Sequence, residues 1–381
     1  MADITRFLIE TAFTRIQQAV GARTGMIDKV DQRTVQLGEL SRIKQLRSQI
    51  SSRSPGLAYY GERVHRYIKA VGAGQKRARA LTREEAREAM TILIEDRATP
   101  EQVGAFLLAL RMKGETADEL AGFVDALRTT FPAHENSERS WIDIDCHGDG
   151  HKGRASLLPA AACIVASLGH PVLLRADLGS STARHGIASA LEGLGLISHP
   201  ARPALAKPPI AVIDLREYCP PLKRLVDLRP LFGVRTVAQT LMKLLDPLPS
   251  RLRLVGVFHA PYLESTARAL AILSDMPAVC VQALGGLPEA APGKITRIAQ
   301  SNATETASLD LRFLPLSPNA DGEDPAEINL AALRGESPAQ ERAIAAAAPL
   351  LHFAENISLK SAASRAEDAI GSGRALKLVR K

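Results

Sequence analysis

The chain has 381 residues and a mass of 40.9 kDa, which is more than one typical domain and predicts two domains with at least one full hydrophobic core. Apolar residues make up 46% and charged residues 23% of the chain, and this composition excludes a wholly disordered or collagen-like protein. Aromatic residues are only 4%, which argues against a single-strand nucleic-acid surface built on stacked rings but leaves binding to backbone phosphate open.

The net charge of +7 is concentrated near the N-terminus. Residues 1–90 contain 17 Lys or Arg against 9 Asp or Glu, an excess of eight positive charges, whereas the remainder has a net charge of −1. Such an excess is typical of a protein with a polyanionic partner, but a solvated helical face is the commoner explanation.

The four cysteines and the long uncharged stretch at residues 155–174 indicate where in the cell the protein is expected. Cys146, Cys163, Cys219 and Cys280 are far apart and form no Cys-x-x-Cys pair, so we expect a reducing compartment, the cytoplasm, and neither disulfides nor a zinc ribbon. Residues 155–174 are nearly uncharged, but proline and glycine interrupt them, which predicts a buried helix and a short strand and no membrane contact. The N-terminus shows no secretory signal pattern.

The first third of the chain is predicted to be helical. Residues 9–20 and 37–50 repeat apolar side chains at spacings of three and four, and the Ser-rich residues 51–56 read as a linker. Thr82 and Thr116 begin capping boxes, and Thr99 precedes a first-turn proline. We therefore expect a helical extension and linker over residues 1–57 and a small helical domain over residues 58–130.

Beyond residue 132 the pattern changes to short apolar runs that alternate with helical segments. The runs are residues 141–145, 172–174, 211–215, 254–258 and 278–281, and the helical segments include 183–194 and 262–273. This alternation predicts a mostly parallel sheet with both faces covered, whose ligands bind beyond the carboxyl ends of the strands. The basic helical residues 222–245 are expected to leave the sheet and pack on the N-terminal helices, which places the binding cleft between the two domains.

The loop after the first predicted strand, residues 145–154, is the clearest candidate for a ligand site. It combines three glycines with Lys152 and Arg154 and leads into a helix, an arrangement that suits phosphate. A polar turn without a ligand is the alternative interpretation. A metal site made of Cys146, His147, Asp149 and His151 is less favoured, because these residues fall within one loop and have no partner pair elsewhere.

Two longer motifs carry a resemblance to a known family. The run Arg229-Pro230-Leu231-Phe232-Gly233-Val234-Arg235-Thr236-Val237, continuing to Asp246-Pro247, resembles the Leu-Gly-Ile-Arg-Thr-Ile-Phe-Asn helix of anthranilate phosphoribosyltransferases and related pyrimidine nucleoside phosphorylases. Residues 185–195 are similar to the same family's Ser-Gly-Ser-Ala-Asp-Val-Leu-Glu-Ala-Leu-Gly. The likeness covers about residues 60–375. It implies an α/β fold in which the helical domain 58–130, joined by about 218–248, accompanies a large α/β domain over 131–217 and 249–381, with dimerisation through the helical domain.

The departures from the family fall on the reacting positions. The family's Gly-Thr-Gly-Gly-Asp loop, which holds phosphoribosyl pyrophosphate, matches residues 148–152, where two glycines remain and the acid does not. The phosphate-binding Asn-Ile-Ser-Thr matches about residues 158–161, which are apolar, and Lys-His-Gly-Asn matches residues 175–178, which keep only the cation. His185 imitates that last motif but lies one motif later, and we expect it to be structural. The magnesium-binding Asp-Glu becomes Pro288-Glu289, whereas Arg229 matches the substrate-facing arginine.

The resemblance, together with the cations, predicts a phosphate-binding surface around one cleft mouth. Its expected members are Gly148, Gly150, Lys152, Arg154, Arg175, Ser180, Thr182, Arg229 and Arg235. Glu289 is the remaining half of a metal site, so we expect no required cofactor, with Mg²⁺ only where a sugar-phosphate donor is bound.

The function that we expect from the sequence is that of a cytoplasmic homodimer that has lost the biosynthetic reaction and binds nucleic-acid backbone without sequence specificity. Nucleic-acid binding is a property linked to a divergent bacterial group of the family. The alternative is an active pentosyltransferase that uses a phosphoribosyl or related sugar-phosphate donor with an altered acceptor, and a regulatory or scaffold role is a third possibility.

Overall fold

The computed structural model describes residues 55–74, 76–131, 140–150, 153–179, 186–197, 209–315 and 322–379. The helices expected over residues 9–20 and 37–50 lie outside these ranges. The chain divides into two compact units, residues 1–58 and 59–381, and the second contains everything described below apart from the first residues of α3.

The N-terminal part of the second unit is helical, as predicted. Its helices are α3 (Pro55–Val71), α4 (Arg83–Ile94), α5 (Pro100–Lys113) and α6 (Ala117–Arg128). Thr82 and Thr116 form the predicted capping boxes, and the predicted cap at Thr99 is also a capping box. In each box the threonine side chain accepts from the backbone amide three residues later, and the side chain of that later residue accepts from the threonine amide. Phe106 and Phe123 meet edge to face, with ring centroids 6.1 Å apart, inside this bundle.

The remainder builds a seven-stranded sheet in the order β3-β2-β1-β4-β5-β6-β7. The strands are β1 (Trp141–Asp145), β2 (Val172–Ala176), β3 (Ile210–Asp214), β4 (Ser250–Val257), β5 (Ala278–Gln282), β6 (Ile295–Gln300) and β7 (Thr306–Asp310). The five strands from β3 to β5 are parallel, which confirms the predicted fold class, and β6 and β7 add an antiparallel edge that the sequence pattern did not indicate.

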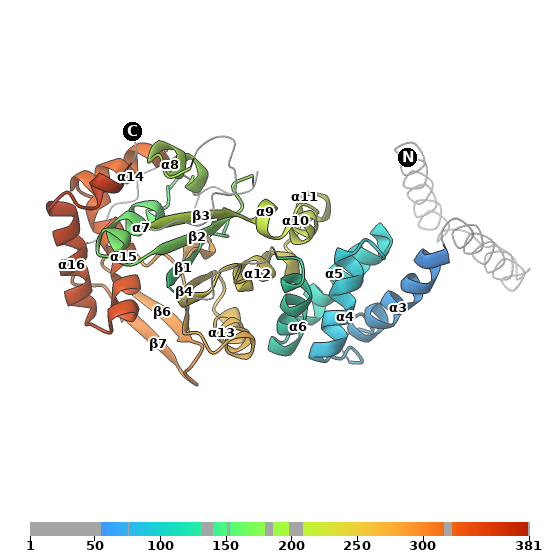
Figure 1. Ribbon diagram of the computed structural model, residues 1–381. Helices are drawn as coiled ribbons and strands as arrows, with labels where there is room; N and C mark the ends of the chain where they lie inside the picture. The colour runs from blue at the N-terminus through green and yellow to red at the C-terminus, as the bar shows by residue number, and fades with distance from the viewer. Residues whose placement is uncertain are drawn as a thin grey trace, which may run out of the picture. The chain divides into compact units, whose positions relative to one another are not determined.

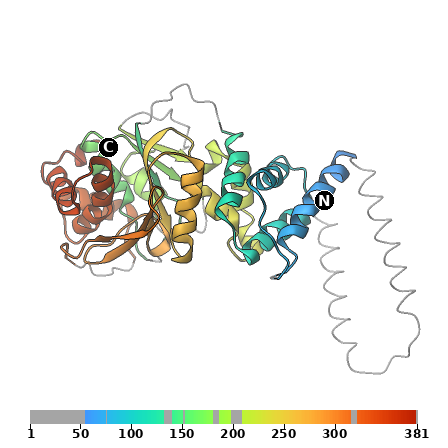
Figure 2. The ribbon, with the colours of Figure 1, turned by 90° about the horizontal axis from the view of Figure 1, so that it is seen from below.

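Helices cover both faces of the sheet (Figures 1 and 2). The helices that follow β1 in the chain are α7 (Leu158–Ser167), α8 (Ile187–Gly193), α9 (Leu215–Tyr218), α10 (Pro220–Val226), α11 (Arg229–Phe232), α12 (Val237–Leu244), α13 (Pro261–Leu273), α14 (Pro325–Arg334), α15 (Ala339–Glu355) and α16 (Leu359–Gly371). The uncharged stretch 155–174 contains α7 and β2, as expected, and within the described ranges no helix is long and apolar enough to span a bilayer. All four cysteines are free and buried.

Two cores hold this unit together. In the first, α7 and α14–α16 pack on one face of the sheet. The second begins in α4–α6 and continues through α12 and α13 to the other face, where it reaches Val255 and Cys280. The helix α12 contacts α5, α6 and β4, which confirms that the basic segment returns to the N-terminal helices. The cores therefore fix the helical bundle against the carboxyl ends of the strands.

Candidate functional site

The sheet reverses its order of strand addition between β1 and β4, because β2 and β3 follow on one side of β1 and β5 on the other side of β4. A cavity of about 830 Å³ opens at the carboxyl end of these strands. Its walls come from residues 146–150 after β1, 177–179 after β2, 256–259 at the end of β4, 285–286 after β5, 111–115 at the end of α5, and 226–243. A crevice at such a switch point is where parallel α/β sheets bind their ligands. The cavity lies between the helical bundle and the sheet, in agreement with the prediction.

The glycines of the loop after β1 serve close backbone packing. The amides of Asp149 and Gly150 both donate to the carbonyl oxygen of Gly285, at 3.0 and 3.3 Å. A Cβ on Gly285 would lie 2.4 Å from the backbone of Gly150, and one on Gly148 would lie 2.6 Å from the Gly285 oxygen. Two loop amides that the sequence suggested for phosphate therefore already have an internal acceptor.

Arg229 and Arg235 reach the large cavity and meet an acid there. Two guanidinium nitrogens of Arg229 donate to the two oxygens of Asp149 at 2.6 and 2.7 Å, and Arg235 also pairs with Asp149. Burial opposes ionisation of Asp149, but the bonds from the two arginines outweigh it and lower the pKa of this carboxyl to about 2. The two arginines expected to bind phosphate are thus neutralised in part by the protein itself.

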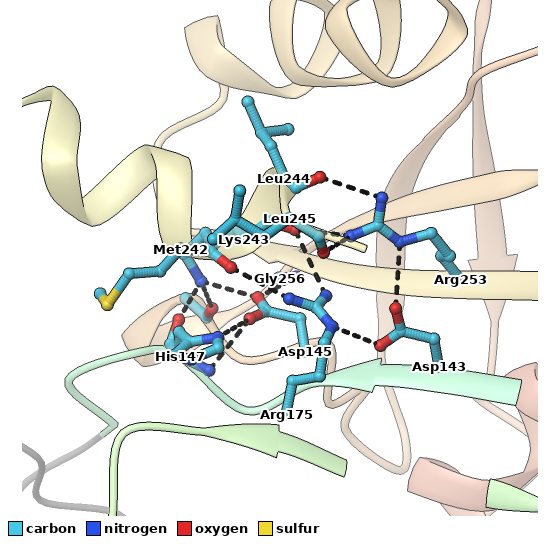
Figure 3. Close-up of polar contacts among 11 residues, drawn as sticks. Asp143, Asp145, His147, Arg175, Met242, Lys243, Leu244, Leu245, Arg253 and Gly256 are labelled. Atoms are coloured by element: carbon cyan, nitrogen blue, oxygen red, sulfur yellow. Dashed lines mark hydrogen bonds and ion pairs between the residues drawn. The ribbon is translucent and has the colours of Figure 1, made fainter. Parts of the chain in front are cut away.

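A second polar cluster lies beneath the first loop (Figure 3). Asp145 accepts from the backbone amide of His147 at 3.0 Å and lies 2.8 Å from Nδ1 of its ring, and the Lys243 ammonium lies 3.0 Å from the other Asp145 oxygen. Lys243 also donates to the carbonyl oxygens of His147 and, at 2.7 Å, of Gly286, which joins α12 to two loops of the sheet. Burial lowers the pKa of His147, although Asp145 acts in the opposite direction, so the imidazole is neutral. Its Nε2 has no hydrogen-bond partner among the described residues.

The predicted role of Arg175 in ligand binding is wrong. It was expected at the cleft mouth, but its side chain is 0% exposed and does not line the cavity. Its Nε donates to Asp143 at 2.7 Å, and Arg253 donates to the other Asp143 oxygen at 3.1 Å (Figure 3). The two guanidinium groups also bind carbonyl oxygens of residues 242–245 at the end of α12. Arg175 therefore ties β1, β2 and β4 to α12, where cations complement the helix C-terminus, and is unavailable to a ligand.

A second cavity, of about 320 Å³, adjoins the loop on its other side and shares Gly150 with the first. Arg154 and Lys294 line it, together with Glu289. The Arg154 side chain is half-buried and makes no hydrogen bond or ion pair with any described residue. Burial and the neighbouring Arg342 lower the pKa of its guanidinium, and the charges of Glu289 and Glu323 oppose this shift only in part. An unpaired, half-buried cation of this kind favours an anionic ligand.

The metal site suggested by the resemblance does not fit the donors present. One oxygen of Glu289 accepts from the Ser156 hydroxyl at 2.6 Å and the other accepts from the Leu157 amide at 3.1 Å. Pro288 stands where the second carboxylate would be, and the described ranges contain no cluster of three His, Cys, Asp or Glu suited to a metal. Glu289 holds the N-terminal turn of α7 in place and is engaged as a structural acceptor.

The predicted site residues therefore separate into groups. Gly148, Gly150, Arg229 and Arg235 line the large cavity and Arg154 the small one, whereas Lys152, Ser180 and Thr182 lie outside the described residues, as do His151 and His185. Sequence reasoning missed Lys243 and the pairing role of Asp149. The basic last turn of α12 was a signal for Lys243, but nothing in the sequence pairs Asp149 with an arginine 80 positions away.

Family models match both parts of the chain. A helical bundle domain of a glycosyl transferase family matches residues 65–131, and the a/b domain of a glycosyl transferase family matches residues 142–376. The chain belongs to this glycosyl transferase family.

Individual relatives narrow the resemblance to one branch. The chain is 33% identical to the anthranilate phosphoribosyltransferase of Thermomicrobium roseum, over 81% of this chain and 93% of that protein, and 32% identical to that of Methylobacterium nodulans, over 81% and 94%. Among solved structures, the anthranilate phosphoribosyltransferase of Thermus thermophilus superposes with a TM-score of 0.71 at 26% identity, over 82% of this chain and 97% of that one. The Saccharomyces cerevisiae enzyme, solved in complex with PRPP and Mg, gives 0.70 at 19% identity, over 83% and 95%, and supports the fold alone. The protein is therefore an anthranilate phosphoribosyltransferase-like member of the family.

Proposed function

We propose that the protein is a pentosyltransferase that takes a phosphoribosyl or related sugar-phosphate donor and transfers the sugar to an acceptor different from that of its relatives. The observation that carries this proposal is the pair of adjoining cavities at the carboxyl edge of the sheet, which meet at Gly150 and differ in charge. Family membership and relatives that carry out phosphoribosyl transfer support the reaction class.

The small cavity suits the phosphate groups of the donor. Among the described residues that line it, the cations are Arg154 and Lys294, and the one acid, Glu289, is engaged by Ser156 and Leu157. Pentosyl transfer passes through a cationic, oxocarbenium-like sugar, so the protein has to stabilise the charge of the departing phosphate and exclude water. In this proposal Arg154 supplies that stabilisation through charge-assisted hydrogen bonds. The sugar and the acceptor then occupy the large cavity beyond Gly150.

Isothermal titration calorimetry with phosphoribosyl pyrophosphate, in buffers with and without Mg²⁺, tests this function. We expect saturable binding that persists without the metal and weakens at least tenfold in Arg154→Ala. Arg297→Ala is the matched control, because Arg297 is an exposed cation on β6 beside Thr296 of the small cavity but does not line that cavity. The proposal would be contradicted if the wild-type protein did not bind phosphoribosyl pyrophosphate, or if the two substitutions weakened its affinity equally.

Nucleic-acid binding is a second candidate, supported by the excess of eight positive charges over residues 1–90. Several cations of this segment are engaged within the protein: Arg63 and Arg66 pair with Glu88, Arg79 with Glu85 and Arg83 with Asp125. Half of the excess belongs to residues 1–54, which carry 9 Lys or Arg against 5 Asp or Glu. Fluorescence anisotropy of a labelled oligonucleotide over a salt series, with the full chain and with a chain lacking residues 1–54, tests it. Binding that weakens steeply with salt and falls on truncation would support this candidate.

A further inference from the structure

We infer that Asp149 determines which acceptor the large cavity takes. Its carboxylate occupies the position at which Arg229 and Arg235 would bind the carboxylate of a ligand, and so directs the cavity to uncharged acceptors that carry N–H groups. This inference rests on the proposed function, because it concerns the acceptor of that same reaction.

The contact between Asp149 and Arg229 has the form that an arginine uses to recognise a carboxylate ligand. Two parallel bonds, of 2.6 and 2.7 Å, join the two nitrogens of one guanidinium to the two oxygens of one carboxylate, and Arg235 pairs with the same group. All three residues line the large cavity. The side chains remain 24%, 23% and 36% exposed for Asp149, Arg229 and Arg235, so a ligand in the cavity could reach them. The protein thus places its own carboxylate at a carboxylate-binding position.

The backbone keeps Asp149 in this position. The Asp149 amide donates to Gly285, and the neighbouring Gly150 does the same. Gly148 and Gly285 lie so close to the opposing backbone that neither position has room for a Cβ. A ligand carboxylate would have to displace a side chain held by two arginines, on a loop that the turn after β5 fixes.

Among the described residues that line the cavity, cations do not outnumber acids. Its described charged side chains, apart from histidine, are the four cations Arg111, Arg229, Arg235 and Lys243 and the four acids Glu115, Asp149, Asp177 and Asp227. Lys243 already has Asp145 and two carbonyl oxygens as partners. Asp177 keeps one buried oxygen without a hydrogen-bond partner among the described residues, which is an acceptor for an N–H group. The relatives named above act on anthranilate, an aromatic amine with a carboxylate, and this cavity is complementary to the amine without the carboxylate.

Calorimetric titration with two probes of the same shape tests the inference without any donor. The probes are anthranilate, which is charged, and 2-aminobenzamide, its uncharged amide. The protein variants are wild type, Asp149→Ala, Asp149→Asn and the control Asp310→Ala. Asp310 is an exposed acid on β7 that pairs with Arg312, and its pKa is also lowered to about 2, so the control removes a comparable ion pair outside the cavity.

We expect Asp149→Ala to bind anthranilate at least tenfold more tightly than wild type does, and Asp149→Asn, which keeps the shape of the side chain, to change in the same direction. Asp310→Ala should match wild type, and 2-aminobenzamide should not gain from either substitution at Asp149. Equal anthranilate affinity in wild type and both Asp149 variants, including no binding in any of them, overturns the inference. Thermal denaturation of each variant establishes that it is folded. A failure of phosphoribosyl pyrophosphate to bind would count against the proposed function and would leave a gain of anthranilate binding in place.

Discussion

The fully buried Asp143 gives the most quantitative prediction. Asp143→Asn keeps the size of the side chain but removes the single negative charge between Arg175 and Arg253, which are 0% and 1% exposed. Two charge-assisted hydrogen bonds, of 2.7 and 3.1 Å, are weakened, and at about 1.5–3 kcal/mol each they amount to about 3–6 kcal/mol. Breaking a buried ion pair from one side costs about 3–5 kcal/mol, which agrees with that range. We therefore expect the free energy of unfolding to fall by about 3–5 kcal/mol.

Urea denaturation measures this loss directly. Trp141 is the only tryptophan of the chain and lies two positions from Asp143 on β1, so its fluorescence reports on the affected strand. With a denaturant slope of about 3 kcal/mol/M, the midpoint should move down by about 1–1.7 M. Asp310→Asn, which removes an exposed ion pair, should leave the midpoint unchanged. A shift for Asp143→Asn no larger than that of the control would refute the tethering role given to Asp143.

Three further predictions concern the loops of the site. The pKa of Asp149 is about 2 in the folded protein and 3.8 ordinarily, so its ion pairs stabilise the fold in full above about pH 4. The difference in free energy of unfolding between wild type and Asp149→Asn should therefore shrink as the pH falls from 3.8 towards 2. Urea denaturation across pH 2.5–7 measures this difference, and a constant value would contradict the prediction. Gly285→Ala should lower the free energy of unfolding by about 1–3 kcal/mol, because φ of Gly285 is +73° and the new Cβ would meet Gly150. The control Gly371→Ala should not destabilise the protein, since no atom lies within 4 Å of its new Cβ. Equal thermal midpoints for the two variants would argue against tight packing of the loop. The pKa of His147, followed by the chemical shifts of its ring protons in NMR spectra, should lie below the ordinary value of 6.5, because burial disfavours the imidazolium. The charged groups around the ring are Asp145, Lys243, Arg175 and Asp177. A titration midpoint at or above 6.5 would contradict the prediction.

Much of the fold could be predicted because local signals and tertiary structure agree. The threonine caps set the starts of α4, α5 and α6, and the apolar runs of β2 and β5 are the pattern of strands buried on both faces. The antiparallel edge was not predicted. β7 reads Thr-Ala-Ser-Leu-Asp and is mostly exposed, so it lacks the apolar run that marked the parallel strands.

The site could be predicted only in part, because its decisive contacts join residues far apart in the chain. Arg175 follows an apolar run and looked like a ligand-binding cation. The pairing of β2 with β1 sets it opposite Asp145, and its side chain bonds to Asp143 on the same strand, which neutralises it. Asp149 was considered from the sequence only as part of a disfavoured metal site, and the return of residues 220–247 to the sheet brings Arg229 and Arg235 to it. The local sequence carries no information about such pairings. The loop glycines could be recognised from the sequence, but they serve backbone packing and not the binding of phosphate that they suggested.

A crystal structure of the protein with phosphoribosyl pyrophosphate tests the proposed function most directly. We expect electron density for the diphosphate in the small cavity, within hydrogen-bond distance of Arg154, and an Asp149 carboxylate still paired with Arg229 and Arg235. Density for the diphosphate on Arg229 and Arg235, with Asp149 displaced, would contradict both the placement of the donor and the role given to Asp149.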